Sequence, residues 1–165
     1  MSETLSEIER LVAIEEIKRL VAKRIRCMDT KNWEEYPSTH APDMVLDSFG
    51  NLPADLKPNS AAGAGTAMGR DAVTAAVRKL VDPLTTVHHA HTPEIEILSP
   101  ATARGLWAME DRLSWQNGDK IEEAHGWGHY HETYVKIDGR WMIKSRKLTR
   151  LRVDTTPGFY EFRQK

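Results

Sequence analysis

This 165-residue sequence lacks the features of several specialised protein classes. A single cysteine, Cys27, excludes an internal disulfide and any zinc site built from several cysteines. No apolar run approaches the roughly 20 residues that cross a bilayer, and the acidic start MSETLSEIERL lacks a secretory pattern. With 23 basic and 24 acidic residues, the chain has no general electrostatic attraction for nucleic acid or an anionic membrane. These absences predict a cytoplasmic protein that binds neither nucleic acid nor membrane.

The order of the expected elements predicts one α+β domain over residues 1–165, a length that can bury a real core. Helices are expected at 6–28, 32–36 (ending at Pro37) and 70–81, and residues 50–69 form a loop or lid. Strands are expected at 44–49, 87–98, 102–115, 126–137 and 140–153, with hairpin turns at Asn117-Gly118 and Asp138-Gly139. The first helix has an apolar stripe at three- and four-residue steps: Leu11, Ile14, Val21, Ile25 and Met28. The sheet is expected to be curved and mostly antiparallel, with about three helices on its concave side around a pocket for a small hydrophobic ligand.

Two acidic residues lie where apolar side chains are expected. Asp111 shares a strand face with apolar residues that include Trp107 and Met109, and a desolvated carboxylate there is costly unless it is paired or protonated. It is either a structural acid bonded to an arginine or a site residue, because carboxyl groups with perturbed pKa values cluster at functional sites. Asp29 ends the first helix on the core side and opposes the helix dipole, so it requires a partner.

A cluster of three histidines, His88, His89 and His91, begins the strand at 87–98. Simple alternation places His89 and His91 on the face of Ile95 and Ile97, and His88 on the other face. One of these histidines is a candidate general base. Two alternatives are surface histidines at a strand end, and a metal site completed by His125, His129 or His131. The spacing is not a specific zinc signature, so we expect no metal.

Four segments, RCMDTKNWEE, HTPEIEI, ATARGLWAMEDRL and YVKIDGRWMIKSRKLTRLR, resemble the SnoaL-like group of the nuclear-transport-factor-2 superfamily. Within it, the pattern is most similar to the bile acid 7α-dehydratase family, with scytalone dehydratase and hexachlorocyclohexane dehydrochlorinase as more distant relatives. The resemblance runs from about Ile14 to Arg152 and implies a cone-shaped fold. It also implies that His88 is catalytic and is oriented by Asp29, with Asp111 and Arg150 as further catalytic residues. For His88 rather than His89 or His91 to face inward, the strand must have a kink at Pro93 or a bulge.

This sequence departs from the bile acid enzymes at two positions. Arg24 stands where they have a helix tyrosine, and Lys120 stands where they have a second tyrosine. The loss of both phenols argues against a bile acid substrate, and Tyr36 and Tyr130 are candidate replacement donors. We therefore expect five residues to contact the substrate: Arg24, Tyr36, Trp107, Lys120 and Tyr130.

The resulting hypothesis is a cofactor-independent lyase that acts on a hydroxylated, hydrophobic ring compound, either steroid-like or a lignin-type aromatic. Proton abstraction assisted by His and Asp would lead to loss of water or to retro-aldol release of formaldehyde. No phosphate loop, dinucleotide fingerprint or metal motif is present in the sequence. The alternatives are an isomerase with the same dyad and a non-catalytic small-molecule-binding or assembly module. A sheet with an apolar outer face needs cover, which predicts a homo-oligomer, either a trimer or a dimer.

Overall fold

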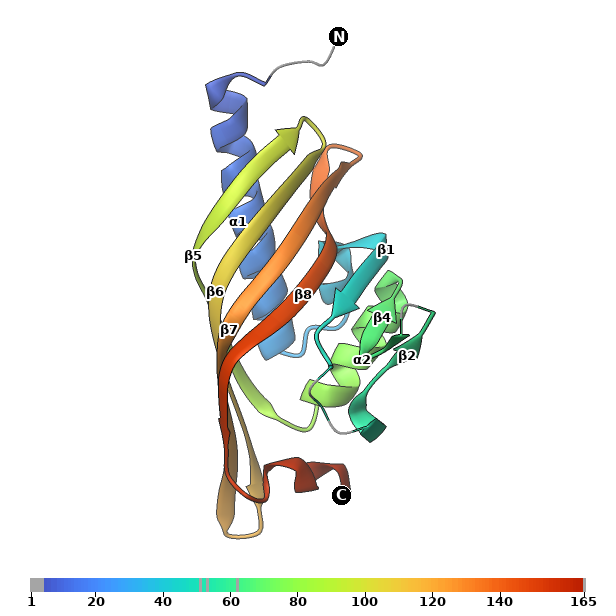
Figure 1. The fold of residues 1–165 in the computed structure, drawn as a ribbon, viewed down its shortest axis with the longest axis vertical. Helices are drawn as coiled ribbons and strands as arrows, with labels where there is room; N and C mark the ends of the chain where they lie inside the picture. Colours follow the sequence, from blue (N-terminus) through green and yellow to red (C-terminus); the bar gives the residue numbers. More distant parts are fainter. Residues whose placement is uncertain (1–4, 51, 53, 62, 165) are drawn as a thin grey trace.

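The computed structural model describes residues 5–164 except residues 51, 53 and 62. Its α-helices are α1 (Glu7–Asp29) and α2 (Arg70–Val81), and its short 3-10 helices are η1 (Tyr36–Thr39), η2 (Ala54–Leu56) and η3 (Phe159–Gln164). The strands are β1 (His40–Asp47), β2 (Asn59–Ser60), β3 (Gly63–Ala64), β4 (Thr66–Met68), β5 (Thr85–Ser99), β6 (Thr102–Asn117), β7 (Lys120–Ile137) and β8 (Arg140–Thr155). The four long strands β5–β8 run beside α1, while β1, β4 and α2 lie to one side of them (Figure 1).

Six strands form the main sheet in the order β4-β1-β8-β7-β6-β5, and β2 and β3 pair separately. The pair β1–β8 is parallel, and the other neighbours in this sheet are antiparallel. The turn between β7 and β8 contains Asp138 at φ 49° and Gly139 at φ 76°, the two positive values that a type I′ hairpin requires. The predicted α+β fold with a curved, mostly antiparallel sheet is confirmed.

Helix α1 begins with a capping box in which Ser6 and Glu9 each bond the backbone N–H of the other. Its buried face contains Ala13, Ile17, Val21, Arg24, Cys27 and Met28. The predicted stripe was wrong at Leu11, which is 66% exposed because it lies on the opposite face of the helix. The buried face therefore includes a charged residue that the apolar stripe did not reveal.

The predicted helix at 32–36 is wrong. The Asn32 side chain accepts a hydrogen bond from the Glu35 backbone N–H, which stabilises a turn, and Pro37 then lies in the first turn of η1. The described residues therefore contain two α-helices rather than about three. Of the predicted loop at 50–69, residues 51, 53 and 62 lie outside the described part. The rest includes η2, β2, β3 and β4, and β4 joins the main sheet beside β1.

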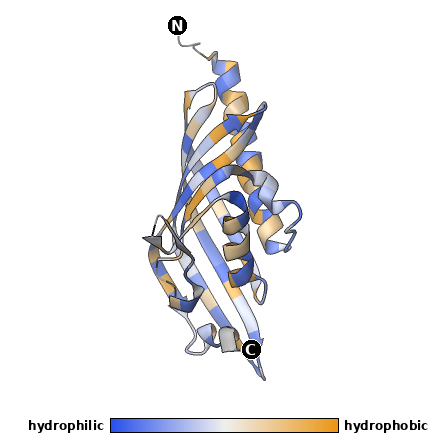
Figure 2. Cartoon of the chain, turned by 90° about the vertical axis from the view of Figure 1, so that its right-hand side faces the viewer, coloured by the Kyte–Doolittle hydropathy of each residue, from blue (hydrophilic) through white to orange (hydrophobic). Residues whose placement is uncertain are grey.

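The core lies between the two α-helices and the face of the sheet turned toward α1, which we call the inner face. Along β6 and β7 buried and more exposed residues alternate, and Figure 2 shows apolar and polar residues interleaved along the strands. Inward residues include Trp107, Met109, Tyr130, Tyr134 and Ile143. In the described residues, no helix has the length and apolar character needed to cross a membrane.

Candidate active site

The C-terminal end of α1 brings Asp29 against the first residues of β5. The Asp29 Oδ1 atom lies 2.6 Å from Nδ1 of His88, and Oδ2 accepts a hydrogen bond of 2.9 Å from the His88 backbone N–H. Thr86 donates its hydroxyl to Oδ1 at 2.8 Å, and Lys31 donates to the Thr86 hydroxyl at 2.9 Å. The carboxylate is thus held by two side chains and one backbone group, and it fixes the orientation of the His88 ring.

These contacts also affect the ionisation of Asp29 and the choice of tautomer at His88. Burial raises the pKa of Asp29, but the hydrogen bonds and charge of His88 and the bond from Thr86 outweigh burial, so this pKa lies below its ordinary value. An ionised carboxylate only accepts hydrogen bonds, so neutral His88 must carry its proton on Nδ1. The other ring nitrogen, Nε2, then keeps its lone pair, as a general base requires.

A β-bulge in β5 explains which histidine faces inward. The register between β5 and β6 shifts between Ala90 and Pro93, so that the alternation is reset. His88 is buried, whereas His89 and His91 are exposed. The prediction from simple alternation that His89 and His91 face inward was therefore wrong. It assumed that the alternation continues unbroken from Ile95 and Ile97 back to these histidines, and the bulge interrupts it.

Asp111 is the cross-strand partner of His88 and forms a bidentate ion pair with Arg150 of β8. The two N–O distances are 2.9 Å for Nη1–Oδ1 and 2.7 Å for Nη2–Oδ2. Gly126 of β7 leaves room for the pair, since a Cβ atom there would lie 2.3 Å from Arg150 Nη1 and 2.5 Å from Asp111 Oδ1. Both groups are thereby positioned beside His88 on the inner face.

A cavity of about 220 Å³ joins these groups. His88, Asp111 and Arg150 line it, together with Arg24 and Tyr130. Much of the remaining lining is apolar and comes from both helices, the sheet, the 48–52 segment and η3: Met28, Leu46, Phe49, Leu52, Val77, Leu80, Val81, Leu113, Leu148, Val153, Phe159 and Tyr160. A largely apolar cavity with a few polar groups in its lining suits a small hydrophobic molecule.

The remaining residues expected to contact substrate differ in position. Tyr36 and Trp107 are buried but are not among the cavity-lining residues. Trp107 instead donates its indole N–H to the Tyr134 hydroxyl at 2.7 Å. Lys120 is exposed at the start of β7, beside the hairpin loop, and does not line the cavity. Asp29 likewise is not a lining residue, but it contacts the lining residue His88.

Three polar residues at the site were not predicted from the sequence. Thr86 contacts Asp29 directly, and Lys31 contacts it through the Thr86 hydroxyl. Arg146 lines the cavity. The alternation of Arg146, Leu148 and Arg150 in KSRKLTRLR could have placed Arg146 on the inner face beside Arg150. Nothing in the sequence pattern singled out Thr86 or Lys31.

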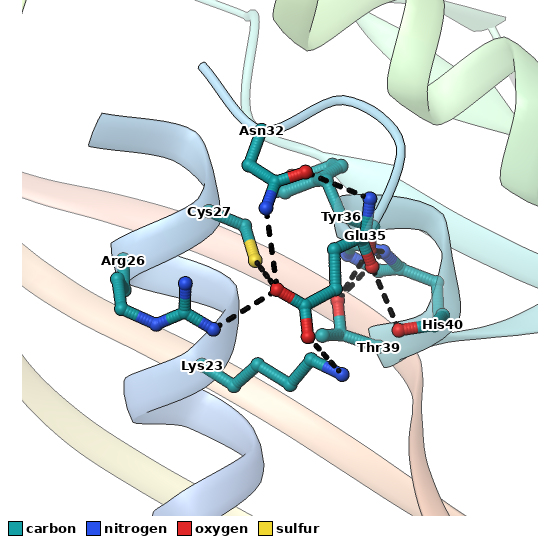
Figure 3. Close-up of polar contacts among 9 residues, drawn as sticks. Lys23, Arg26, Cys27, Asn32, Glu35, Tyr36, Thr39 and His40 are labelled. Carbon is teal, nitrogen blue, oxygen red and sulfur yellow. Dashed lines mark hydrogen bonds and ion pairs between the residues drawn. The ribbon is translucent and has the colours of Figure 1, made fainter. Parts of the chain in front are cut away.

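The end of α1 that carries Asp29 is tied to the following turn by Glu35 (Figure 3). One carboxylate oxygen of Glu35 is 2.9 Å from Lys23 Nζ, and the other accepts hydrogen bonds from Arg26 at 3.0 Å and Asn32 at 3.3 Å. The Cys27 thiol lies 3.5 Å from the same oxygen as a weak donor. The lysine contact, followed by that of Arg26, lowers the pKa of Glu35 to about 2. Four side chains thus fix the geometry of the helix end.

Two histidines on the outer face of the sheet share a carboxylate. His89 and His125 both contact the Glu110 carboxylate, at 3.2 Å and 3.0 Å. Within the described ranges, no group of three or more histidine, cysteine, aspartate or glutamate side chains is arranged to hold a metal ion.

Residues 9–147 match the protein family described as the SnoaL-like domain. A protein named "Probable cyclase FGR4" from Gibberella zeae is 23% identical over 135 residues, which cover 82% of this chain and 89% of the relative. The crystal structure of a "Putative Scytalone Dehydratase" from Novosphingobium aromaticivorans has a TM-score of 0.76 at 20% identity and covers 92% of each chain. A hexachlorocyclohexane dehydrochlorinase (LinA) type 2 has a TM-score of 0.75 at 16% identity, covering 93% of this chain and 95% of its own.

Proposed function

This chain belongs to the SnoaL-like domain family, and from that premise we propose that it is a lyase which removes a proton from carbon with His88 as the base. The observation that carries the proposal is the 2.6 Å contact between Asp29 and a histidine that lines an apolar cavity. A partly buried carboxylate here contacts the imidazole, and in other catalytic Asp–His pairs such a carboxylate fixes the ring and stabilises its protonated form. The similarity to dehydratase, dehydrochlorinase and cyclase proteins supports chemistry of this kind.

The proposed substrate is a hydroxylated hydrophobic ring compound, steroid-like or a lignin-type aromatic, with a carbonyl next to the acidic C–H bond. Nε2 of His88 takes the proton, and the electron pair of the C–H bond moves toward the carbonyl to give an enolate. Arg150, held in position by Asp111, stabilises this negative charge. When the enolate collapses, the C–O bond to the hydroxyl group breaks, and the imidazolium returns its proton to form water.

A related elimination is retro-aldol release of formaldehyde, in which the base removes the hydroxyl proton and a C–C bond breaks. Neither reaction requires a cofactor, and we propose that the enzyme uses none. An isomerase would differ only in the last step, since the imidazolium would return the proton to another carbon. The mass of the product separates these reactions, because an isomerisation leaves the mass unchanged.

The test is a mass-spectrometric screen of the protein against aromatic and steroid compounds that carry a hydroxyl group β to a carbonyl. We expect a product lighter by water or formaldehyde, and a fall in turnover of about a hundredfold or more in His88→Ala and in Asp29→Asn. His89→Ala is the matched control, because His89 is the next residue on the same strand and is exposed. Full turnover in His88→Ala, or damage confined to His89→Ala, would refute the proposal.

A further inference from the structure

Two arginines in the interior present charged donors to the cavity. Arg24 of α1 is 0% exposed and Arg146 of β8 is 5% exposed, and both line the cavity. In the described part of the chain, no group accepts a hydrogen bond from Nε, Nη1 or Nη2 of Arg24, or from Nε or Nη1 of Arg146. A buried charged donor without an acceptor destabilises a fold, so this arrangement is retained at a cost to stability.

The positive charge of these arginines is only partly balanced. Within the described residues, the one carboxylate near either is Glu132, whose Oε1 lies 3.9 Å from Arg24 Nη2, beyond hydrogen-bond distance. The other oxygen of Glu132 is already bonded to the Tyr134 hydroxyl at 2.5 Å. Burial, followed by the charges of Arg146 and Arg24, holds the pKa of His40 well below its usual range, so that this buried ring stays neutral. The two guanidinium cations of Arg24 and Arg146 thus have one carboxylate, that of Glu132, to balance their charge.

Both guanidinium groups lie close to the Tyr130 ring, and all three side chains line the cavity. Their central carbons lie 4.9 Å (Arg24) and 5.3 Å (Arg146) from the centre of the Tyr130 ring. Arg146 and Arg150 are four residues apart on the inner face, about 13 Å along an extended strand. Along α1, Arg24 is five residues before Asp29, about 7.5 Å along the helix. Both elements therefore place the arginine pair away from the His88 end of the cavity.

We propose that Arg24 and Arg146 bind a carboxylate of the substrate, so that the substrate is an aromatic or alicyclic organic acid whose ring lies toward His88. This inference rests on the proposed function, since it names the class of substrate for the same cavity. The enolate oxygen formed in the reaction is a poorer match for the pair. The enolate exists only transiently, whereas the uncompensated charge of the arginines is present in the resting protein. A carboxylate also has two oxygens with about four acceptor positions, which suit the five donor nitrogens of Arg24 and Arg146 that have no acceptor.

Calorimetric titration with 2-naphthoate and its neutral counterpart 2-naphthamide tests the proposal without turnover. We expect the protein to bind naphthoate at least about tenfold more tightly than the amide, and Arg24→Met and Arg146→Met each to remove that preference. Arg112→Met is the control, because Arg112 is exposed on the outer side of β6. His88→Ala should still bind naphthoate, so failure of the proposed chemistry would leave this result intact.

Thermal melting distinguishes a ligand-binding role from a structural one. If Arg146 is kept for a ligand, Arg146→Met should melt no lower than the parent protein without ligand and should lose the upward shift in Tm that naphthoate produces. Three outcomes would overturn the proposal: no binding of naphthoate, equal binding of naphthoate and the amide, or unchanged naphthoate affinity in both Met variants. Competition by inorganic phosphate at the affinity of naphthoate would also overturn it, because the site would then select charge alone.

Discussion

Gly126 and Gly128 are two residues apart on the inner face of β7, but an added methyl group would meet different neighbours. At Gly126 the nearest atoms belong to the side chains of Arg150 and Asp111. At Gly128 a Cβ atom would lie 2.0 Å from the backbone oxygen of Thr149, on the adjacent strand β8. The first position therefore makes room for the ion pair of the site, and the second allows two strands to approach closely.

This contrast gives a prediction for a matched pair of variants. Gly126→Ala should displace the Asp111–Arg150 pair and lower turnover, with a smaller effect on stability, because side-chain ends can move aside. Gly128→Ala should destabilise the protein by at least about 2 kcal/mol, since backbone atoms of a central strand cannot move aside cheaply. Urea unfolding curves and turnover of the same samples provide the measurements. Equal losses of stability in both variants would contradict this interpretation.

At the scale of single residues, sequence reasoning identified the groups with the clearest chemical conflict. Asp29 and Asp111 stood out because each is an acid on an apolar face, and the structure gives each a charged or histidine partner. Arg146 was missed because a cationic residue in a strand rich in lysine and arginine reads as solvated. Only its alternation with Leu148 and Arg150 separates it from neighbours such as Lys147, which is exposed.

Among the elements, the end of α1 depends on Glu35 for its connection to the following turn. The folded pKa of about 2 lies below the ordinary value of 4.5, so the ionised carboxylate contributes stability above the unfolded pKa. That contribution is lost as the pH falls from about 4.5 toward 2. Because the side chain is 38% exposed, solvent screens these contacts and the effect on stability is modest.

We therefore expect Glu35→Gln to lower the Tm at pH 7 and the difference from the parent protein to shrink below pH 4.5. Thermal melts at several pH values between 7 and 2.5 would measure this difference. Glu34→Gln is the control, since the adjacent Glu34 is exposed and is not among the side chains that contact the Glu35 carboxylate. A difference that stays constant over this range would show that ionisation of Glu35 does not stabilise the fold.

Elements with uninterrupted periodicity could be predicted, and those set by local irregularity could not. The helix at 70–81 and the strand starts at Thr102 and Arg140 match the structure. The bulge in β5 was expected only through the family resemblance, because one extra residue opposite β6 leaves no trace in composition. The turn at Asn32 replaced a predicted helix because one side-chain hydrogen bond favours it over so short a helix.

At the scale of the whole molecule, exposed apolar residues lie on α1 as well as on the sheet. The expectation of a homo-oligomer rested on an apolar outer face of the sheet. That face carries many polar residues, including His89, Glu110 and Arg112, although Leu151 of β8 is also exposed. A second exposed apolar set lies on α1, on the side opposite the core: Ile8, Leu11 and Val12. These three residues are spaced to share one helix face, and exposed apolar patches often mark contacts between proteins.

We predict that the protein forms a dimer or trimer in which this face of α1 is covered. Leu11→Glu should then shift the protein to monomer in sedimentation at micromolar concentration, because a carboxylate in an apolar contact is desolvated without a partner. Leu151→Glu, in β8, serves as the comparison, since Leu151 is 74% exposed and belongs to a different element. If only Leu151→Glu dissociates the oligomer, the sheet rather than the helix forms the interface. A parent protein that sediments as a monomer at these concentrations would refute self-association itself, because neither apolar set would then have a partner of the same chain.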